Sequence, residues 1–183
     1  MKRFLGAAAG LMVAAVAGGC ASAISVSSHF DRAQDFKLYR TYDWGPADAL
    51  PTGDPRLDRD PFFKDYFQGA VARQLARKGL ELVPLGGKPD LLIHYHANIS
   101  DRMDVDLADR ASGYCANEVC PAESVWYEAG TLVLDFMDAR STKLVWRGWA
   151  QNDVAGMLRD RDEMARTIDR AVVKMMQRYP PSR

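Results

Sequence analysis

Three stretches of this chain alternate apolar and polar residues with the two-residue period of a half-buried β-strand. In the first, the apolar members are Leu91, Ile93, Tyr95, Ala97 and Ile99, and the residues between them are Leu92, His94, His96 and Asn98. The other two stretches, 131–137 and 144–149, flank a turn-like segment and predict a hairpin. An apolar sheet face must be buried against another layer, and this requirement constrains the fold more than any other feature of the chain.

Two amphipathic helices can form that layer. Asp60 and Pro61 provide an N-cap and a first helical residue, apolar residues recur at helical spacing to about residue 78, and Gly79 suits the position after the helix. A second helix is expected after Asp160, which with Glu163 resembles a capping box. Its apolar stripe comprises Met164, Ile168, Ala171, Val172, Met175 and Tyr179.

The remaining segments predict short strands and loops. Residues 80–83 are a short strand, and Tyr42 and Trp44 alternate as on one strand face, so we expect the aromatic side chains around them to be core rather than a ligand-stacking surface. Residues 45–60 and 100–124 are polar and predict loops. The sequence therefore predicts an α+β fold: a single domain with a mostly antiparallel sheet of about six strands and two helices packed on one face.

The N-terminal segment predicts export. Lys2 and Arg3 precede an apolar run over residues 4–17, which is shorter than the roughly 20 residues of a membrane span, and Gly18-Gly19-Cys20 follows. This layout resembles a bacterial lipobox, although Ala17 stands where that motif prefers Leu. We expect residues 1–19 to be a lipoprotein signal peptide and Cys20 to carry the lipid, with palmitate among its acyl chains. Ordinary secretion with cleavage after Ala23 is the alternative.

Lipidation at Cys20 would place the protein in the cell envelope. Ala21, rather than Asp, follows the cysteine, which implies an outer-membrane lipid anchor with the domain facing the periplasm. Residues 20–28 are then the lipidated N-terminus and a short tether, and residues 29–180 are the domain. Without the signal, 22 basic residues face 24 acidic ones, a net charge of −2. No basic stripe indicates nucleic acid, so the expected membrane contact is the lipid.

The other two cysteines, Cys115 and Cys120, form an even pair in a compartment that favours disulfides. We expect a disulfide that fixes local loop shape, since so small a ring contributes little to stability. Free thiols or a thiol metal site are the alternatives; a CxxxxC spacing with no second ligand pair is weak evidence for a metal.

His94 and His96 share the more polar face of their predicted strand, at a spacing that could ligate a metal ion. The simpler interpretation is two histidines on a solvated or helix-covered face. The only other histidine is His29, which the sequence does not place nearby. The motifs of hydrolases, metalloproteases and nucleotide-binding enzymes are absent, so we expect no enzymatic activity and no cofactor.

Several short motifs, in order and spacing, resemble one known family. They are Phe30-Asp31, Asp35-Phe36, Thr41-Tyr42-Asp43-Trp44, Asp90-Leu91-Leu92-Ile93, Gly130-Thr131-Leu132-Val133-Leu134-Asp135 and Trp146-Arg147-Gly148. Together they are similar to the bacterial envelope lipoproteins of domain of unknown function family 4136, from about Val26 to Pro180. The resemblance implies a cell-envelope lipoprotein with an α+β domain, and it brings no catalytic residues. The Cys115 to Cys120 segment lies outside the shared pattern.

These observations favour a non-enzymatic accessory or binding role in the envelope, with an envelope protein or cell-wall component as partner. The alternative is a soluble periplasmic or membrane-tethered protein that binds a small ligand or metal through the His94/His96 strand face.

Overall fold

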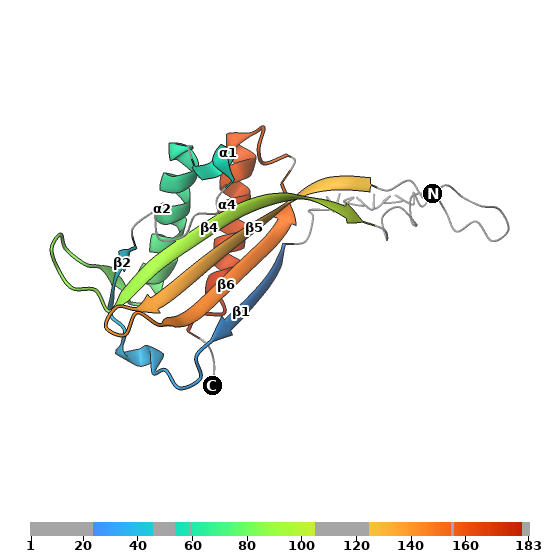
Figure 1. Ribbon diagram of the computed structural model, residues 1–183. Coiled ribbons are helices and arrows are strands. Elements are labelled where there is room, and N and C mark those ends of the chain that lie inside the picture. The colour runs from blue at the N-terminus through green and yellow to red at the C-terminus, as the bar shows by residue number, and fades with distance from the viewer. Residues whose placement is uncertain (1–23, 46–53, 59, 105–124, 155, 181–183) are drawn as a thin grey trace, which may run out of the picture.

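The computed structural model describes residues 24–45, 54–58, 60–104, 125–154 and 156–180. A six-stranded sheet in the order β1-β6-β5-β4-β2-β3 forms one layer (Figure 1). The strands are β1 Ser25–Phe30, β2 Thr41–Trp44, β3 Glu81–Leu82, β4 Leu91–Asp104, β5 Val125–Asp138 and β6 Leu144–Asp153. The helices are the 3-10 turn η1 Phe36–Leu38, the single turn α1 Pro55–Asp58, and the long helices α2 Pro61–Arg77 and α4 Arg161–Met176.

The strand directions confirm a mostly antiparallel sheet. β1 pairs with β6, β6 with β5 and β5 with β4, all antiparallel. β2 runs parallel to both β4 and β3, because the chain returns from β2 to β3 through helix α2 and a helical crossover joins parallel strands. The predicted α+β fold is therefore correct, with a mixed pairing at one edge.

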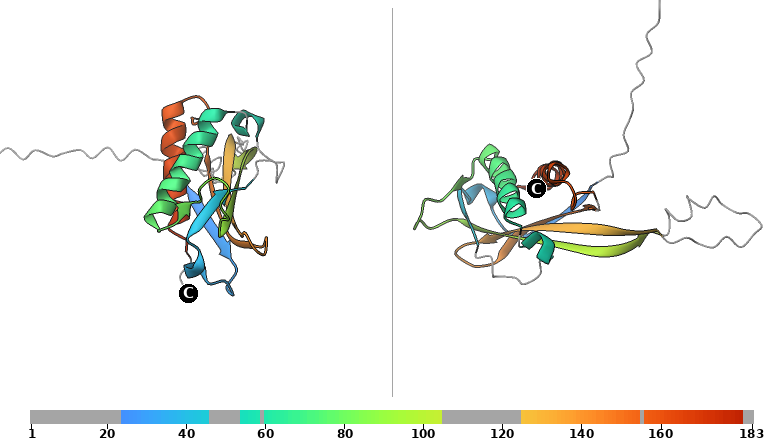
Figure 2. Two further views of the ribbon diagram at one scale, coloured as in Figure 1. Left: turned by 90° about the vertical axis from the view of Figure 1, so that its left-hand side faces the viewer. Right: turned by 90° about the horizontal axis from the view of Figure 1, so that it is seen from above.

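Both long helices lie on the same side of the sheet (Figure 2). Helix α2 begins where the sequence predicts, since the Asp60 side chain accepts a hydrogen bond from the Phe62 amide, and it is followed by Gly79 at a φ of +79°. Asp160 caps α4 by accepting from the amides of Asp162 and Glu163. Sequence-local signals thus set the start of both helices and the end of α2.

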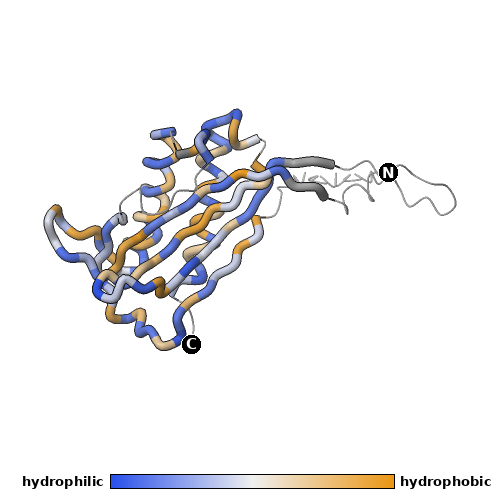
Figure 3. The backbone as a smooth tube through the Cα atoms, in the orientation of Figure 1, coloured by the Kyte–Doolittle hydropathy of each residue, from blue (hydrophilic) through white to orange (hydrophobic). Residues whose placement is uncertain are grey.

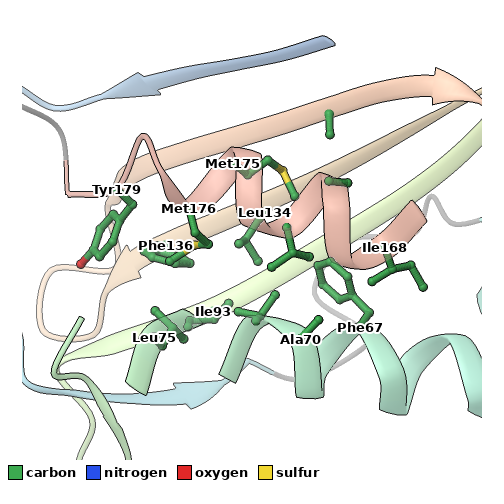
Figure 4. Packing of buried hydrophobic residues seen from close by; sticks show 14 of the residues in the cluster. Phe67, Ala70, Leu75, Ile93, Leu134, Phe136, Ile168, Met175, Met176 and Tyr179 are labelled. Carbon is green, nitrogen blue, oxygen red and sulfur yellow. The ribbon is translucent and has the colours of Figure 1, made fainter. Parts of the chain in front are cut away.

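The core lies between the helices and the sheet, where the alternating apolar strand residues meet the helical stripes (Figures 3 and 4). Trp146 is fully buried, with its ring centroid 4.9 Å from that of Phe136 and 5.4 Å from that of Tyr179. The Trp146 ring lies directly over the Cα of Gly148, a position where any Cβ would overlap it. The predicted aromatic core is confirmed: Tyr42 is 3% exposed and makes an edge contact with Trp44.

Three segments differ from the sequence-based expectation. Residues 100–104, predicted to be loop, are strand, because backbone pairing with 125–129 extends the β4–β5 ribbon regardless of its polar sequence. A helical turn, α1, occupies part of the predicted loop 45–60. Residues 25–28, expected to be part of the tether, belong to β1. Ile24, directly before them, is a core residue with an exposed fraction of 7%.

Candidate binding face

The side of the sheet opposite the helices, here called the open face, carries a row of polar side chains across four strands. Ile93, Phe136 and Trp146 point into the core, so the residues next to them point the other way. The strand register aligns four of these neighbours: His29 pairs with Arg147, Arg147 with Asp135, and Asp135 with His94. One row on the open face therefore combines a carboxylate, a guanidinium and two imidazoles.

The centre of this row is an ion pair. Arg147 donates from Nε to Asp135 Oδ1 and from an Nη to Oδ2, both at 2.6 Å, which is the bidentate geometry of a strong charge-assisted pair. The Asp135 side chain is only 4% exposed, whereas that of Arg147 is 43% exposed. These hydrogen bonds raise the pKa of the Arg147 guanidinium. Because both Asp135 oxygens are engaged, this carboxylate is poorly placed to act as a general base, whereas the outer side of the guanidinium can still donate to a ligand.

A second row lies one step further along the strands. Ser27 pairs with Trp149, Trp149 with Val133, and Val133 with His96. Trp149 is partly exposed, and both long helices lie on the other side of the sheet (Figure 2). An indole and a guanidinium thus lie two residues apart on one strand, a combination suited to a ligand with both a flat apolar surface and hydrogen-bond acceptors.

The structure places all three histidines on the open face, as the sequence predicted for His94 and His96. His29 and His94 share a row but are three strand spacings apart, about 14 Å, too far for one metal ion. The His94 ring lies against the Cα of Gly45. Within the described part of the chain, no three His, Cys, Asp or Glu side chains gather closely enough to hold a metal.

The predicted lipidation at Cys20 and the predicted disulfide between Cys115 and Cys120 fall outside the described residues. Both stay predictions.

A second feature is an apolar crevice between the helices and the sheet, of about 40 Å³. Ile24, Phe63 and Ile168 are among its lining residues, as is Asn152, whose buried Oδ1 has no hydrogen-bond partner among the described residues. The crevice is far smaller than the roughly 300 Å³ of a small-molecule site. We therefore regard the open face as a better candidate for recognition than this crevice.

The Asp135–Arg147 pair was not predicted from the sequence, although a signal for it was present. In a hairpin centred on residues 138–144, opposite charges at 135 and 147 lie on the same face and at nearly matching distances from the turn. The register shifts by one residue between Phe136 and Met137, and Asp135 pairs with Arg147 only because of this shift. Turn chemistry alone does not predict where such a β-bulge occurs.

Residues 26–181 match the protein family described as a domain of unknown function, DUF4136. The chain belongs to this family. The resemblance seen in the sequence motifs is therefore correct over nearly the same boundaries. A comparison of the chain with curated proteins finds no match.

A comparison of this DUF4136 domain with solved structures finds matches at low sequence identity. A PDZ domain protein from Parabacteroides distasonis superposes with a TM-score of 0.56 at 14% identity; the match covers 88% of this chain but only 37% of that protein. A DUF4136 family protein from Bacteroides thetaiotaomicron gives a TM-score of 0.46 at 13% identity, and the match covers 82% of this chain and 95% of that protein. The PelC dodecamer from Paraburkholderia phytofirmans gives a TM-score of 0.43 at 9% identity, and the match covers 84% of this chain and 95% of the PelC chain.

None of the helices in the described part of this DUF4136 domain has the length and apolar character needed to cross a bilayer.

Proposed function

We propose that this protein is a non-enzymatic envelope lipoprotein, anchored through Cys20 at the periplasmic side of the outer membrane, whose open face binds an envelope protein or a cell-wall component. The observation that carries the proposal is the short distance along the chain between the lipidation motif and the first core residue. Cys20 precedes Ile24 by four residues, and Ile24 is already buried.

Ile24 is held from two sides. Its side chain lies in the core, and its carbonyl oxygen accepts a hydrogen bond from Lys174 Nζ on α4 at 3.3 Å. Four residues of extended chain reach at most about 14 Å. A lipid on Cys20 would therefore hold the domain directly beside the bilayer, as expected of a protein that works at a membrane surface.

The open face supports the binding role. Arg147 offers a guanidinium oriented by Asp135, and Trp149 offers a partly exposed indole beside it. Peptides and glycans of the envelope carry carboxylates, carbonyls and flat apolar surfaces, which are the groups that such side chains recognise. No step of this recognition requires a bond to be broken.

The anchor is tested by metabolic labelling with a palmitate analogue, followed by separation of membranes from soluble periplasm. Wild type is expected to be labelled and to sediment with the outer membrane. Cys20→Ser is expected to lose the label and become soluble, whereas the control Cys115→Ser keeps both. A wild-type protein that is unlabelled and soluble in the periplasm would refute the anchor.

The binding face is tested separately by cross-linking in intact cells and comparing Trp149→Ala with Val173→Ala, which truncates an exposed apolar side chain on α4. We expect Trp149→Ala alone to lose a stoichiometric cross-linked envelope component. Equal yields from both variants and wild type would rule out the open face as the binding site.

A further inference from the structure

Strand β1 forms one edge of the sheet. Only one side of this strand is paired, with β6, and among the described residues no other strand lies along its outer side (Figure 1). An unpaired strand edge presents a row of amide and carbonyl groups to which another strand can bind. The question is whether this edge carries the features by which proteins normally prevent such pairing.

The rest of the sheet border has such features. The opposite edge, β3, is two residues long and is followed by Pro84. The part of β4 that extends beyond β2 is contacted by another segment, since the Asp54 amide donates to the Ala97 carbonyl at 3.0 Å, and further along it contains the exposed Asp101. Short edges, prolines and charges all discourage strand addition. β1 differs: its six residues include no proline, lysine, arginine or carboxylate.

The backbone groups that point outward from β1 follow from the pairing with β6. The Asp31 amide donates to the Val145 carbonyl at 2.9 Å, so in an antiparallel ladder the alternate residues His29, Ser27 and Ser25 also direct their backbone groups at β6. The remaining residues of the strand, Val26, Ser28 and Phe30, direct theirs away from the sheet. The Ile24 carbonyl fits this alternation, because it is bound from outside the sheet by Lys174.

The three residues whose backbone groups point outward, Val26, Ser28 and Phe30, can pair with the same residues of a second copy. In an antiparallel pair of two β1 strands centred on Ser28, each Val26 lies opposite the other copy's Phe30, and Ser28 lies opposite its equivalent. Val26 and Phe30 are both partly buried at the rim of the core. A β-branched residue opposite an aromatic one is a favourable cross-strand pair. The centred register forms about six backbone hydrogen bonds and places no like charges opposite each other.

We propose that β1 is a homodimerisation edge, at which a second copy of this chain adds its own β1 antiparallel and extends the sheet across a two-fold axis. The axis is perpendicular to the sheet, so both copies carry their helices on the same side. This inference does not depend on lipidation, because the contact involves only residues of the folded domain.

The test is disulfide trapping at the two-fold axis, in the full chain carrying Cys20→Ser. Ser28→Cys would bring two Cα atoms to about 5.5 Å, within the range of a disulfide. The matched control is Ser25→Cys, because Ser25 is the more exposed of the two positions but lies about 20 Å from its equivalent in this register. After mild oxidation, we expect the 28–28 linked peptide to form at least tenfold faster than the 25–25 peptide.

Equal rates, no cross-linking, or faster cross-linking at position 25 would each overturn the proposal. Should Ser28→Cys fail to fold, the sedimentation mass of the Cys20→Ser chain over a wide concentration range decides instead. A rise toward twice the monomer mass that is abolished by Ser28→Pro, with thermal stability retained, is the expected result. A monomer at all concentrations would refute the dimer. Cross-linking in cells that joins position 28 only to a different protein, and never to a second copy of this chain, would also refute it.

Discussion

Replacing Arg147 by methionine should destabilise the domain more than replacing its partner Asp135 by asparagine. The reason is the asymmetry of the pair: the Asp135 side chain is 4% exposed and that of Arg147 is 43% exposed. Without Arg147, a buried carboxylate loses both of its 2.6 Å hydrogen bonds and has little access to water. Removing one partner of a buried pair costs 3–5 kcal/mol, and the partial exposure of Arg147 places this pair at the lower end, about 3 kcal/mol.

Asp135→Asn keeps the size of the side chain and leaves Arg147 charged, but that guanidinium can turn toward solvent. We expect the variant to lose about 1 kcal/mol. For a domain of this size, 1 kcal/mol shifts the melting temperature by about 2–4 °C. Arg147→Met should therefore lower it by about 6–12 °C and Asp135→Asn by about 2–4 °C.

The assay is urea unfolding of both single variants and the double variant, with melting temperatures from calorimetry. Arg166→Met is the reference, since Arg166 and Glu163 form an exposed pair that contributes at most about 1 kcal/mol. The double variant should be more stable than Arg147→Met, because no buried charge remains. If Arg147→Met costs no more than Arg166→Met or Asp135→Asn, the argument from burial is wrong.

Three further predictions concern local features. Gly148→Ala should cost about 1–3 kcal/mol in urea unfolding, because the new Cβ overlaps the enclosed Trp146 ring; a neutral result would mean that the ring can move. Asp160→Ala should remove the α4 N-cap and lower the free energy of unfolding by about 1 kcal/mol, which thermal unfolding can measure; an unchanged stability would contradict the capping role. Hydrogen bonds led by the Arg40 amide lower the pKa of Asp90, so this carboxylate stabilises the fold above its ordinary pKa of 3.8, and the contribution disappears as pH falls through the lowered pKa. Asp90→Asn should then be less stable at pH 7 and lose less stability on acidification, and an unchanged slope of stability against pH would exclude Asp90 as a source.

Local sequence patterns predicted the elements that depend on neighbouring residues. Asp60-Pro61 and Gly79 delimit α2, Asp160 caps α4, and the alternation around Ile93 identifies the buried side of β4. These predictions succeeded because caps and periodicity are properties of a few consecutive residues. The same logic failed at residues 100–104, whose polar sequence suggests a loop although their backbone pairs with β5.

The sequence by itself determined the fold class, the two helices, the central hairpin, the placement of His94 and His96 on one strand face, and membership of the family. Only the tertiary structure decided that β1 lies beside β6, which brings His29 into the row of Arg147, Asp135 and His94 and, within the described ranges, leaves the other side of β1 without a paired strand. The difference is physical. Helix caps and strand faces follow from interactions a few residues apart, whereas the pairing of His29 with Arg147 joins distant parts of the chain and is selected by burial of the core as a whole.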